Sequence, residues 1–416
     1  MMTQKKKRLS KFTESLVPSS IPKDWKLTEV GTLLSHTEYG LSEPGDSEGE
    51  TPIVGMKDLI AGKVVLSDLA TINGEGIDLD KLRLCKGDIL LNRTNSPDLV
   101  GKVAIVREDS EAVFASYLVR LAVKQESANS DFLNEWLNGD IAQRAIKRIA
   151  TRAVSQANVN PTEFKKYCPV LLPSTHKEQQ RIAAVLRCWD DAIDNLELSI
   201  AKRETQYAAE STRFFSPCHP TYSERQDYWR PYKLGQLFQE RAVPGEVSET
   251  LLSITMADGI TSQESAGRRD SSTEDKSKYK LILPGDIGYN TMRMWQGVCG
   301  LSALRGIISP AYTVVTPVAS KIDARYAFHL FKSKRMIHDF ERYSQGLTSD
   351  TWNLKFPAFS EIKVFIPDPA VQVAQARYLD ALKEEIEVLE RQAEALRSQK
   401  RGLMQKLLTG EWRVKL

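Results

Sequence analysis

Cysteine is scarce in this sequence, and the residues present are widely spaced. None of the five cysteines belongs to a C-x-x-C pair, and their spacing suits neither a disulfide framework nor a zinc site. They are Cys85, Cys168, Cys188, Cys218 and Cys299. We therefore expect no structural metal, and a reducing cytoplasm fits this cysteine usage.

Long apolar runs are also absent. No stretch approaches the roughly 20 apolar residues of a membrane-spanning helix. The basic residues 5–8 are not followed by an apolar segment, so the N-terminus lacks the pattern of a secretory signal. We expect residues 1–20 to be a disordered tail. The net charge of +3 is weak evidence for a nucleic-acid partner, although acidic residues concentrated on the helical segments below would leave other surfaces basic.

Complete catalytic motifs are missing as well. Residues 160–164 resemble the N-P-P-(F/Y) motif of adenine methyltransferases but lack its second proline. Residues 74–76 lack the third glycine of a dinucleotide loop, and there is no P-loop. Asp350 and residues 361–363 have a nuclease-like carboxylate–lysine pattern, which we interpret as coincidence because 361–363 lie in an expected structural strand. The five histidines show no metal-ligand spacing. We expect no catalytic residue and no metal site.

The strongest positive signal is a heptad pattern over Pro369–Leu408. Apolar residues recur every seven positions in two interleaved sets, with charged residues between them. The first set is Leu379, Ile386, Ala393 and Leu407, interrupted by Lys400, and the second is Leu382, Leu389, Leu396 and Leu403. A pattern sustained over about four heptads is typical of a coiled coil. Such a helix buries one apolar stripe, so the stripe needs a partner.

A second segment supplies that partner. Residues 177–214 carry the same pattern, and prolines precede and follow them. Its apolar positions are Ile182, Leu186, Trp189, Ile193, Leu196, Ile200 and Tyr207. We predict that the two helices pack on each other as an antiparallel coiled coil. The alternative is two amphipathic helices that pack on separate cores.

The order of elements repeats within the chain. Each half has a tryptophan-containing start, a turn ending in Gly-Asp-Ile before a buried strand, further strands, a helical stretch, a polar segment and a last strand before a long helix. The helical stretches are residues 131–149 and 323–343, and the polar segments are residues 152–160 and 345–353. Recurrence of the whole order at an offset of roughly 195 residues predicts two mixed α/β regions, each followed by a long helix.

With these features the sequence resembles the specificity subunit of a type I restriction–modification system. The repeat is one basis for the resemblance. The second is the start of the first long helix, where residues 172–173 (LP) are followed by residues 178–182 (EQQRI). The third and most specific is the C-terminal run of residues 402–410 (GLMQKLLTG), followed by WRV at 412–414. Residues 372–375 (QVAQ) lack the acidic–Gln pair of the family, which leaves the start of the second helix open.

The resemblance implies a non-catalytic DNA-recognition subunit with two target recognition domains. It implies domains at residues 21–173 and 217–367, each for one half of a bipartite asymmetric site, and conserved helices at 174–216 and 368–416. The helices would set the spacing and dock two methyltransferase subunits, and restriction motor subunits would join the full complex. S-adenosylmethionine, ATP and Mg would be bound by those partners and not by this chain. The expected compartment is the cytoplasm of a bacterium or archaeon.

Polar loops carried by the expected strands are the candidate DNA contacts. Arg can pair with guanine, and Asn or Gln with adenine, when such side chains lie on loops of a rigid scaffold. In the first half the candidates are Asn92, Arg93, Thr94, Asn95, Ser96, Arg152, Ser155, Gln156 and Asn158. In the second half they are Asn290, Thr291, Arg293, Trp295, Gln296, Gln345, Thr348 and Ser349. For each residue alone, a solvated loop is an equal alternative; recurrence of the clusters in both halves favours contact.

Two other functions remain as alternatives. A coiled-coil assembly adaptor would have no sequence preference for DNA. A stand-alone enzyme would transfer methyl groups or cleave DNA without partners, which the missing motifs disfavour.

Overall fold

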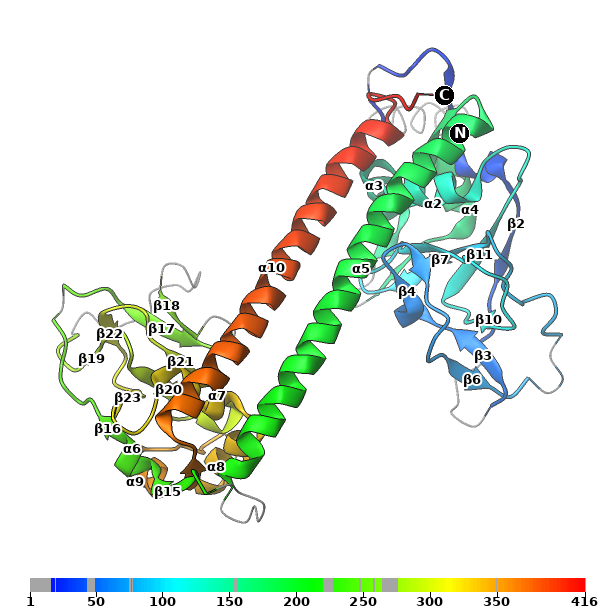
Figure 1. The fold of residues 1–416 in the computed structure, drawn as a ribbon. Coiled ribbons are helices and arrows are strands. Elements are labelled where there is room, and N and C mark those ends of the chain that lie inside the picture. The colour runs from blue at the N-terminus through cyan, green and yellow to red at the C-terminus, as the bar shows by residue number, and fades with distance from the viewer. Residues whose placement is uncertain are drawn as a thin grey trace. The chain divides into compact units, whose positions relative to one another are not determined.

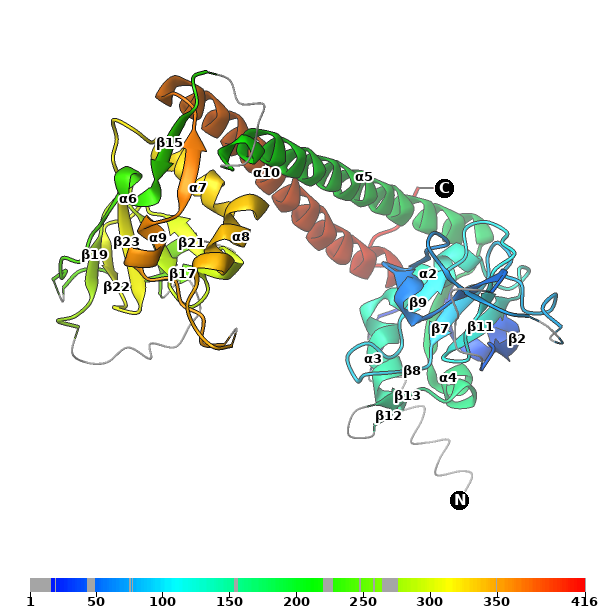
Figure 2. The same ribbon diagram turned by 90° about the horizontal axis from the view of Figure 1, so that it is seen from below.

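The computed structural model describes residues 16–18, 20–42, 49–74, 76, 78–152, 156–219, 227–246, 248–256, 259–263, 276–348 and 350–415. The chain forms two compact units (Figures 1 and 2). Unit 1 comprises Met1–Asn195 and Ala393–Leu416, and unit 2 comprises Leu196–Gln392. Among the helices in these described ranges, none has the length and apolarity needed to cross a membrane.

Unit 1 is built on a six-stranded sheet with the order β2-β11-β7-β9-β5-β4. All four residues of the interior strand β7 (Ile89–Asn92) are buried, as expected for residues 89–91. A separate antiparallel pair joins β1 (Trp25–Glu29) to β14 (Pro169–Pro173). The other strands of the large sheet are β2 (Leu34–Tyr39), β4 (Leu59–Ile60), β5 (Lys63–Val64), β9 (Val103–Ile105) and β11 (Leu118–Val123). A three-stranded sheet contains β3 (Thr51–Val54), β6 (Ala70–Ile72) and β10 (Val113–Phe114).

The helical stretch of unit 1 is divided. Instead of one helix over residues 131–149, there are α2 (Ser130–Asn138) and α3 (Asp140–Ile149), because Gly139 between them is extended at ψ 157°. A further helix, α4 (Pro161–Tyr167), begins where the Asn160 side chain accepts a hydrogen bond from the Thr162 N–H. Asn caps and first-turn Pro are common at helix starts, so residues 160–164 are a capped helix.

The core of unit 1 extends into the segment expected to be a disordered tail. Leu16 is 4% exposed and packs in the main core with Trp25 and Trp136. The prediction of a disordered tail over residues 1–20 is therefore wrong at Leu16, whose burial is favourable. Residues 1–15 and 19 lie outside the described residues.

Unit 2 repeats this architecture. Its four-stranded sheet has the order β16-β23-β20-β21, which corresponds to β2-β11-β7-β9, and β15 pairs with β24 as β1 does with β14. These strands are β15 (Arg230–Lys233), β16 (Phe238–Glu240), β20 (Ile287–Asn290), β21 (Cys299–Leu301), β23 (Tyr312–Pro317) and β24 (Lys363–Ile366). The remaining strands are β17 (Leu252–Thr255), β18 (Gly259–Ser262), β19 (Lys280–Ile282) and β22 (Gly306–Ile308). The helices are α6 (Leu234–Leu237), α7 (Ala324–Lys332), α8 (Lys334–Tyr343) and α9 (Phe356–Ser360), so the expected helix over 323–343 is also divided, at Ser333.

A pair of glutamines shows the repeat at atomic level. The Gln179 side chain donates to the Pro173 carbonyl and accepts from the N–H of Asn129, which caps α2. The Gln372 side chain donates to the Pro367 carbonyl and accepts from the N–H of Asp323, which caps α7. Gln372 therefore has the same role in unit 2 that Gln179 has in unit 1.

The two long helices are α5 (His176–Phe215) and α10 (Pro369–Leu408), which settles the open start of the second helix. They are antiparallel. Asp190 contacts Lys400 within unit 1, whereas further along α5 in unit 2, Arg203 contacts the earlier α10 residue Glu385 at 2.8 Å. Of the predicted heptad positions, those that are buried are Ile182, Leu186, Ile193, Leu379, Leu382, Ala393 and Leu407. Those that are half-buried are Trp189, Leu196, Ile200, Ile386, Leu389, Leu396 and Leu403.

Lys400, which interrupts the heptad pattern, is held by two acids of unit 1. Its Nζ lies 2.7 Å from the Asp190 carboxylate on α5 and 3.3 Å from that of Glu135 on α2. Burial raises the pKa of Glu135, and Lys400 opposes that rise. The interruption is therefore a buried ionic contact among three helices.

The matching place in unit 2 has different chemistry. The Tyr207 hydroxyl on α5 lies 3.0 Å from His329 Nδ1 on α7, and His329 Nε2 lies 2.7 Å from Asp380 on α10. Burial lowers the pKa of His329, and Asp380 opposes that change. In each unit, polar contacts thus connect both long helices to one shorter helix, which is α2 in unit 1 and α7 in unit 2.

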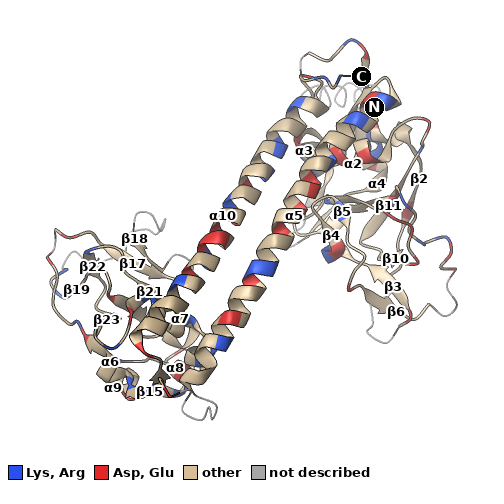
Figure 3. Ribbon diagram, in the orientation of Figure 1, with Lys and Arg blue, Asp and Glu red and all other residues tan. Residues whose placement is uncertain are grey.

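Both long helices carry basic as well as acidic residues along their length (Figure 3). The expectation that acidic residues concentrate there is therefore wrong, and it gives no support to a basic surface elsewhere.

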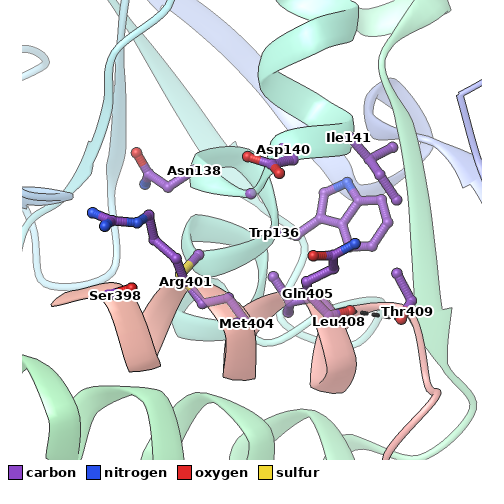
Figure 4. Close-up of a pocket in the computed structure, with 12 residues that line it drawn as sticks. Trp136, Asn138, Asp140, Ile141, Ser398, Arg401, Met404, Gln405, Leu408 and Thr409 are labelled. Carbon is purple, nitrogen blue, oxygen red and sulfur yellow. Dashed lines mark hydrogen bonds between the residues drawn. The ribbon is translucent and has the colours of Figure 1, made fainter. Parts of the chain in front are cut away.

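The last turns of α10 pack beside α2 and α3 of unit 1. Trp136 and Ile141 line a pocket of about 380 Å³ there together with Met404, Gln405 and Leu408 (Figure 4). The Trp136 indole donates to the Pro169 carbonyl at 2.7 Å, which holds one wall of the pocket in place.

Candidate nucleic-acid interface

In unit 1, the first candidate cluster starts in the core. Asn92 ends β7, its side chain is fully buried, and neither of its amide atoms has a partner among the residues that the structure describes. Asn92 therefore does not lie on the surface, whereas a direct contact with DNA would require a surface position. Arg93 is half-buried, and its guanidinium lies 5.0 Å from the centre of the Tyr39 ring. Such a cation–π contact holds the guanidinium beside an exposed aromatic ring.

The two polar clusters of unit 1 meet in one small sheet. β8 (Thr94–Asn95) pairs with β13 (Ala157–Asn158), which in turn pairs with β12 (Thr151–Arg152). The Val159 N–H also donates to the Arg93 carbonyl at 2.7 Å. Segments about sixty positions apart in the chain thus present one polar surface.

The exposed candidates of this surface are Gln156 and Asn158. Thr94, Asn95 and Ser96 are half-buried, and the Asn95 side chain accepts from the Ser96 N–H at 2.8 Å, which fixes the turn after β8. Ser155 lies outside the described residues, and only the backbone of Arg152 is described.

In unit 2, the equivalent cluster lines a hollow of about 480 Å³. Asn290 ends β20 and accepts from the Met292 N–H, while the Thr291 hydroxyl donates to the Ala311 carbonyl. The lining residues are Asn290, Met292, Arg293, Trp295, Gln296, Ser309, Ala311, Tyr312 and Asp350. Donors and acceptors therefore gather in a concave site rather than on a flat surface.

The tryptophan wall of this hollow is fixed. The Trp295 indole donates to the Met292 carbonyl at 3.0 Å, and its ring meets Trp352 edge-on with centroids 5.4 Å apart. The Leu354 N–H donates to the Thr291 carbonyl, as Val159 does to Arg93 in unit 1. The second polar segment of unit 2 is therefore joined to the first, which is the same arrangement as in unit 1.

That second segment is a tight hairpin. Gln345 and Asn353 exchange two backbone hydrogen bonds of 2.9 Å, and the Thr351 hydroxyl closes the turn by donating to the Thr348 carbonyl. Gly346 has φ 149°, and a Cβ added there would lie 2.7 Å from the Thr351 backbone, so the turn requires glycine. Gln345, Thr348 and the apolar Leu347 are exposed, whereas Ser349 lies outside the described residues.

The sequence candidates omitted several residues at these surfaces. Tyr39 and Tyr117 are 52% and 50% exposed in unit 1. Ser309, Tyr312 and Asp350 line the hollow of unit 2. Exposed aromatic residues at a strand end were a usable signal for the tyrosines, but the placement of Asp350 depends on the hairpin fold and had none.

A comparison with protein-family models defines the class of the first part of the chain. Residues 22–202 match the type I restriction modification DNA specificity domain. Over 417 residues the chain is 22% identical to the putative type I restriction enzyme MjaX specificity subunit of Methanocaldococcus jannaschii, covering 95% of each protein. Over 182 residues it is 26% identical to the type I restriction enzyme EcoBI specificity subunit of Escherichia coli, covering 42% of this chain and 37% of that protein.

Solved structures share the fold. The S subunit of a type I restriction–modification system from M. genitalium superposes with a TM-score of 0.59 at 15% identity, covering 96% of this chain and 98% of that one. A chain from a type I R-M system described for its complex assembly and conformational transition gives 0.55 at 14% identity, covering 95% and 100%. Over most of its length the chain is thus similar to specificity subunits of type I restriction–modification systems, and residues 22–202 match the DNA specificity domain.

Proposed function

We propose that each unit of this chain recognises one half of a bipartite, asymmetric DNA site. The observation that supports this most is the recurrence of one arrangement: in both units, two polar segments distant in sequence are joined at the ends of equivalent strands. Loops held by a rigid scaffold are where recognition side chains are expected. The exposed residues differ between the units, with Gln156 and Asn158 in unit 1 and Arg293 and Gln345 in unit 2. Different side chains would favour different half-sites.

We further propose that the paired helices dock two methyltransferase subunits and set the spacing between half-sites. Large apolar side chains remain exposed on both helices, in addition to the buried and half-buried heptad positions. They are Val185 and Leu198 on α5, and Tyr378 and Val388 on α10. Leu198 is 69% exposed. Apolar groups of this kind are favourable contacts for a partner helix.

In this proposal the chain itself is not an enzyme. S-adenosylmethionine would be bound by the methyltransferase subunits, and ATP and Mg by motor subunits that join the full complex. The residues that invited a catalytic interpretation have structural roles: Asn160 caps α4, and Glu361 forms an ion pair with Lys233 at 2.6 Å.

The competing function is a coiled-coil adaptor without sequence preference. Binding of the reconstituted complex to all duplexes with equal affinity would favour it.

The test is modification mapping of genomic DNA with the chain and its methyltransferase subunit. We expect a split motif with methylated adenines. Asn158→Ala should relax the motif on one side only, because Asn158 is exposed on unit 1. The matched control is Glu108→Ala, also exposed in unit 1 but following β9 at the sheet end opposite Asn92. Loss of specificity on both sides, or on neither, would contradict the assignment of unit 1 to one half-site.

A further inference from the structure

The hollow of unit 2 holds a carboxylate that the recognition residues identified above do not include. Asp350 lines it together with Arg293, although the two residues belong to different segments. Asp350 is exposed, and within the described part of the chain its carboxylate has neither an ion pair nor a hydrogen bond. The other residues of the nuclease-like pattern that includes Asp350 in the sequence have different roles, since Glu361 pairs with Lys233 and Lys363 lies in β24.

A free carboxylate on a DNA-binding surface is unfavourable unless it has a specific partner. It repels the phosphate backbone, which supplies most of the non-specific affinity. It becomes favourable where a base amino group donates to it, as the N4 group of cytosine does in the major groove. A carboxylate at this position therefore weakens non-specific DNA binding more than it weakens binding to a site that presents a base amino group to it.

Arg293 supplies the complementary half. It is exposed, and within the described part of the chain its guanidinium makes one long hydrogen bond, from Nη1 to the Gln296 side chain at 3.3 Å. Guanidinium groups pair bidentately with the O6 and N7 atoms of guanine. An A·T pair would offer the same two side chains only single contacts, because thymine O4 is one acceptor and adenine N6 one donor group.

We propose that Arg293 and Asp350 together recognise one G·C pair in the half-site of unit 2, with Arg293 on guanine and Asp350 on the cytosine amino group. This inference rests on the proposed DNA-recognition function. The hollow is preorganised for this contact because Trp295 is fixed by Met292 and Trp352, and the 345–353 hairpin is closed by its own backbone bonds. Rigid placement lowers the entropy lost on binding.

The test uses the full chain with its methyltransferase subunit and duplexes randomised across the half-site of unit 2. The wild type should select G·C at one position. Asp350→Asn removes the charge with little change in shape, and should reduce discrimination at that position by roughly 5- to 150-fold while leaving or raising affinity for other sequences. Arg293→Ala should relax the same position. The matched control is Glu341→Gln, an exposed carboxylate on α8.

The outcomes separate this inference from the function on which it rests. Retained selection at the other positions of the same half-site shows that unit 2 is folded in each variant. If the two variants affect different positions, no position, or all sequences equally, the pairing of Arg293 with Asp350 is refuted while sequence recognition stands. If the wild-type complex selects no sequence in either half-site, the proposed function fails as well.

Discussion

Replacement of Lys400 by methionine tests whether the ionic contact at the end of α10 stabilises unit 1. Lys400 is 13% exposed in its side chain, and its partners Asp190 and Glu135 are 10% and 6% exposed. Lys400→Met keeps the apolar stem and removes the charge. Two buried carboxylates would then lie at one site without the ammonium group that bonds to both. Ionised carboxylates are acceptors only and cannot hydrogen-bond to each other.

The expected loss is large for a single substitution. Removing one member of a buried ion pair destabilises proteins by roughly 3–5 kcal/mol, since it leaves an uncompensated buried charge. Replacing all three residues together, with Glu135→Gln and Asp190→Asn, should recover part of that loss because no buried charge remains.

The loss should depend on pH with a definite sign. Burial raises the pKa of Glu135, and Lys400 is the principal group that lowers it, so the substitution raises that pKa further. The folded variant then holds a proton that the unfolded chain has released, and its stability falls as pH rises through this window. The deficit relative to wild type should therefore be smaller at about pH 5 than at about pH 8.

Urea unfolding of the full chain at both pH values measures the effect, with hydrogen exchange identifying the unit that opens. The control is Arg401→Met, which removes an exposed pair with Glu394 and should change stability by at most about 1 kcal/mol. Equal, small effects for both substitutions, or a deficit that grows on acidification, would refute the reasoning.

Two further predictions concern the helices. Gly402 lies inside α10, and a Cβ added there meets no atom within 4 Å, so Gly402→Ala should raise the stability of unit 1 by up to about 1 kcal/mol. A lower melting temperature would contradict this. Loss of methyltransferase binding despite the gain in stability would mean that the partner approaches the α10 backbone. Burial lowers the pKa of His329 although Asp380 opposes that change, so unit 2 should lose stability as pH falls below about 6.5. His329→Gln should flatten this pH dependence, measured by thermal unfolding between about pH 7 and 5. An unchanged slope would show that another group is responsible.

The periodic parts of the fold were predictable from the sequence. The heptad pattern over residues 369–408 predicted α10, although its exact start stayed open, and the repeat of element order predicted two units with equivalent sheets. The divisions of the helical stretches at Gly139 and Ser333 were missed, because apolar spacing continues across a single extended residue.

The candidate site was predictable only as segments. The pattern of polar residues after buried strands located both clusters in each half, but strand pairing decides which side chains are exposed. Asn92 is the last residue of a buried strand and its side chain lies inside, whereas Asn158, on the partner segment, is exposed. Asp350 lines the hollow because it lies in the 345–353 hairpin, whose turn requires Gly346. Nothing in the local composition indicated that placement.

The unlike polar contacts of the two units restrict how such chains can exchange parts. Glu135 and Lys400 lie 265 positions apart, so a recombination event that replaces residues 21–173 brings one member of the contact and leaves the other behind. An incoming region with an apolar or basic residue in place of Glu135 would leave Lys400 with Asp190 alone. An incoming region with a histidine at position 135 would place that histidine beside Lys400, whereas His329 lies beside Tyr207. New specificities should therefore arise most readily from donors that keep an acid at this position of α2, whatever their recognition loops contain.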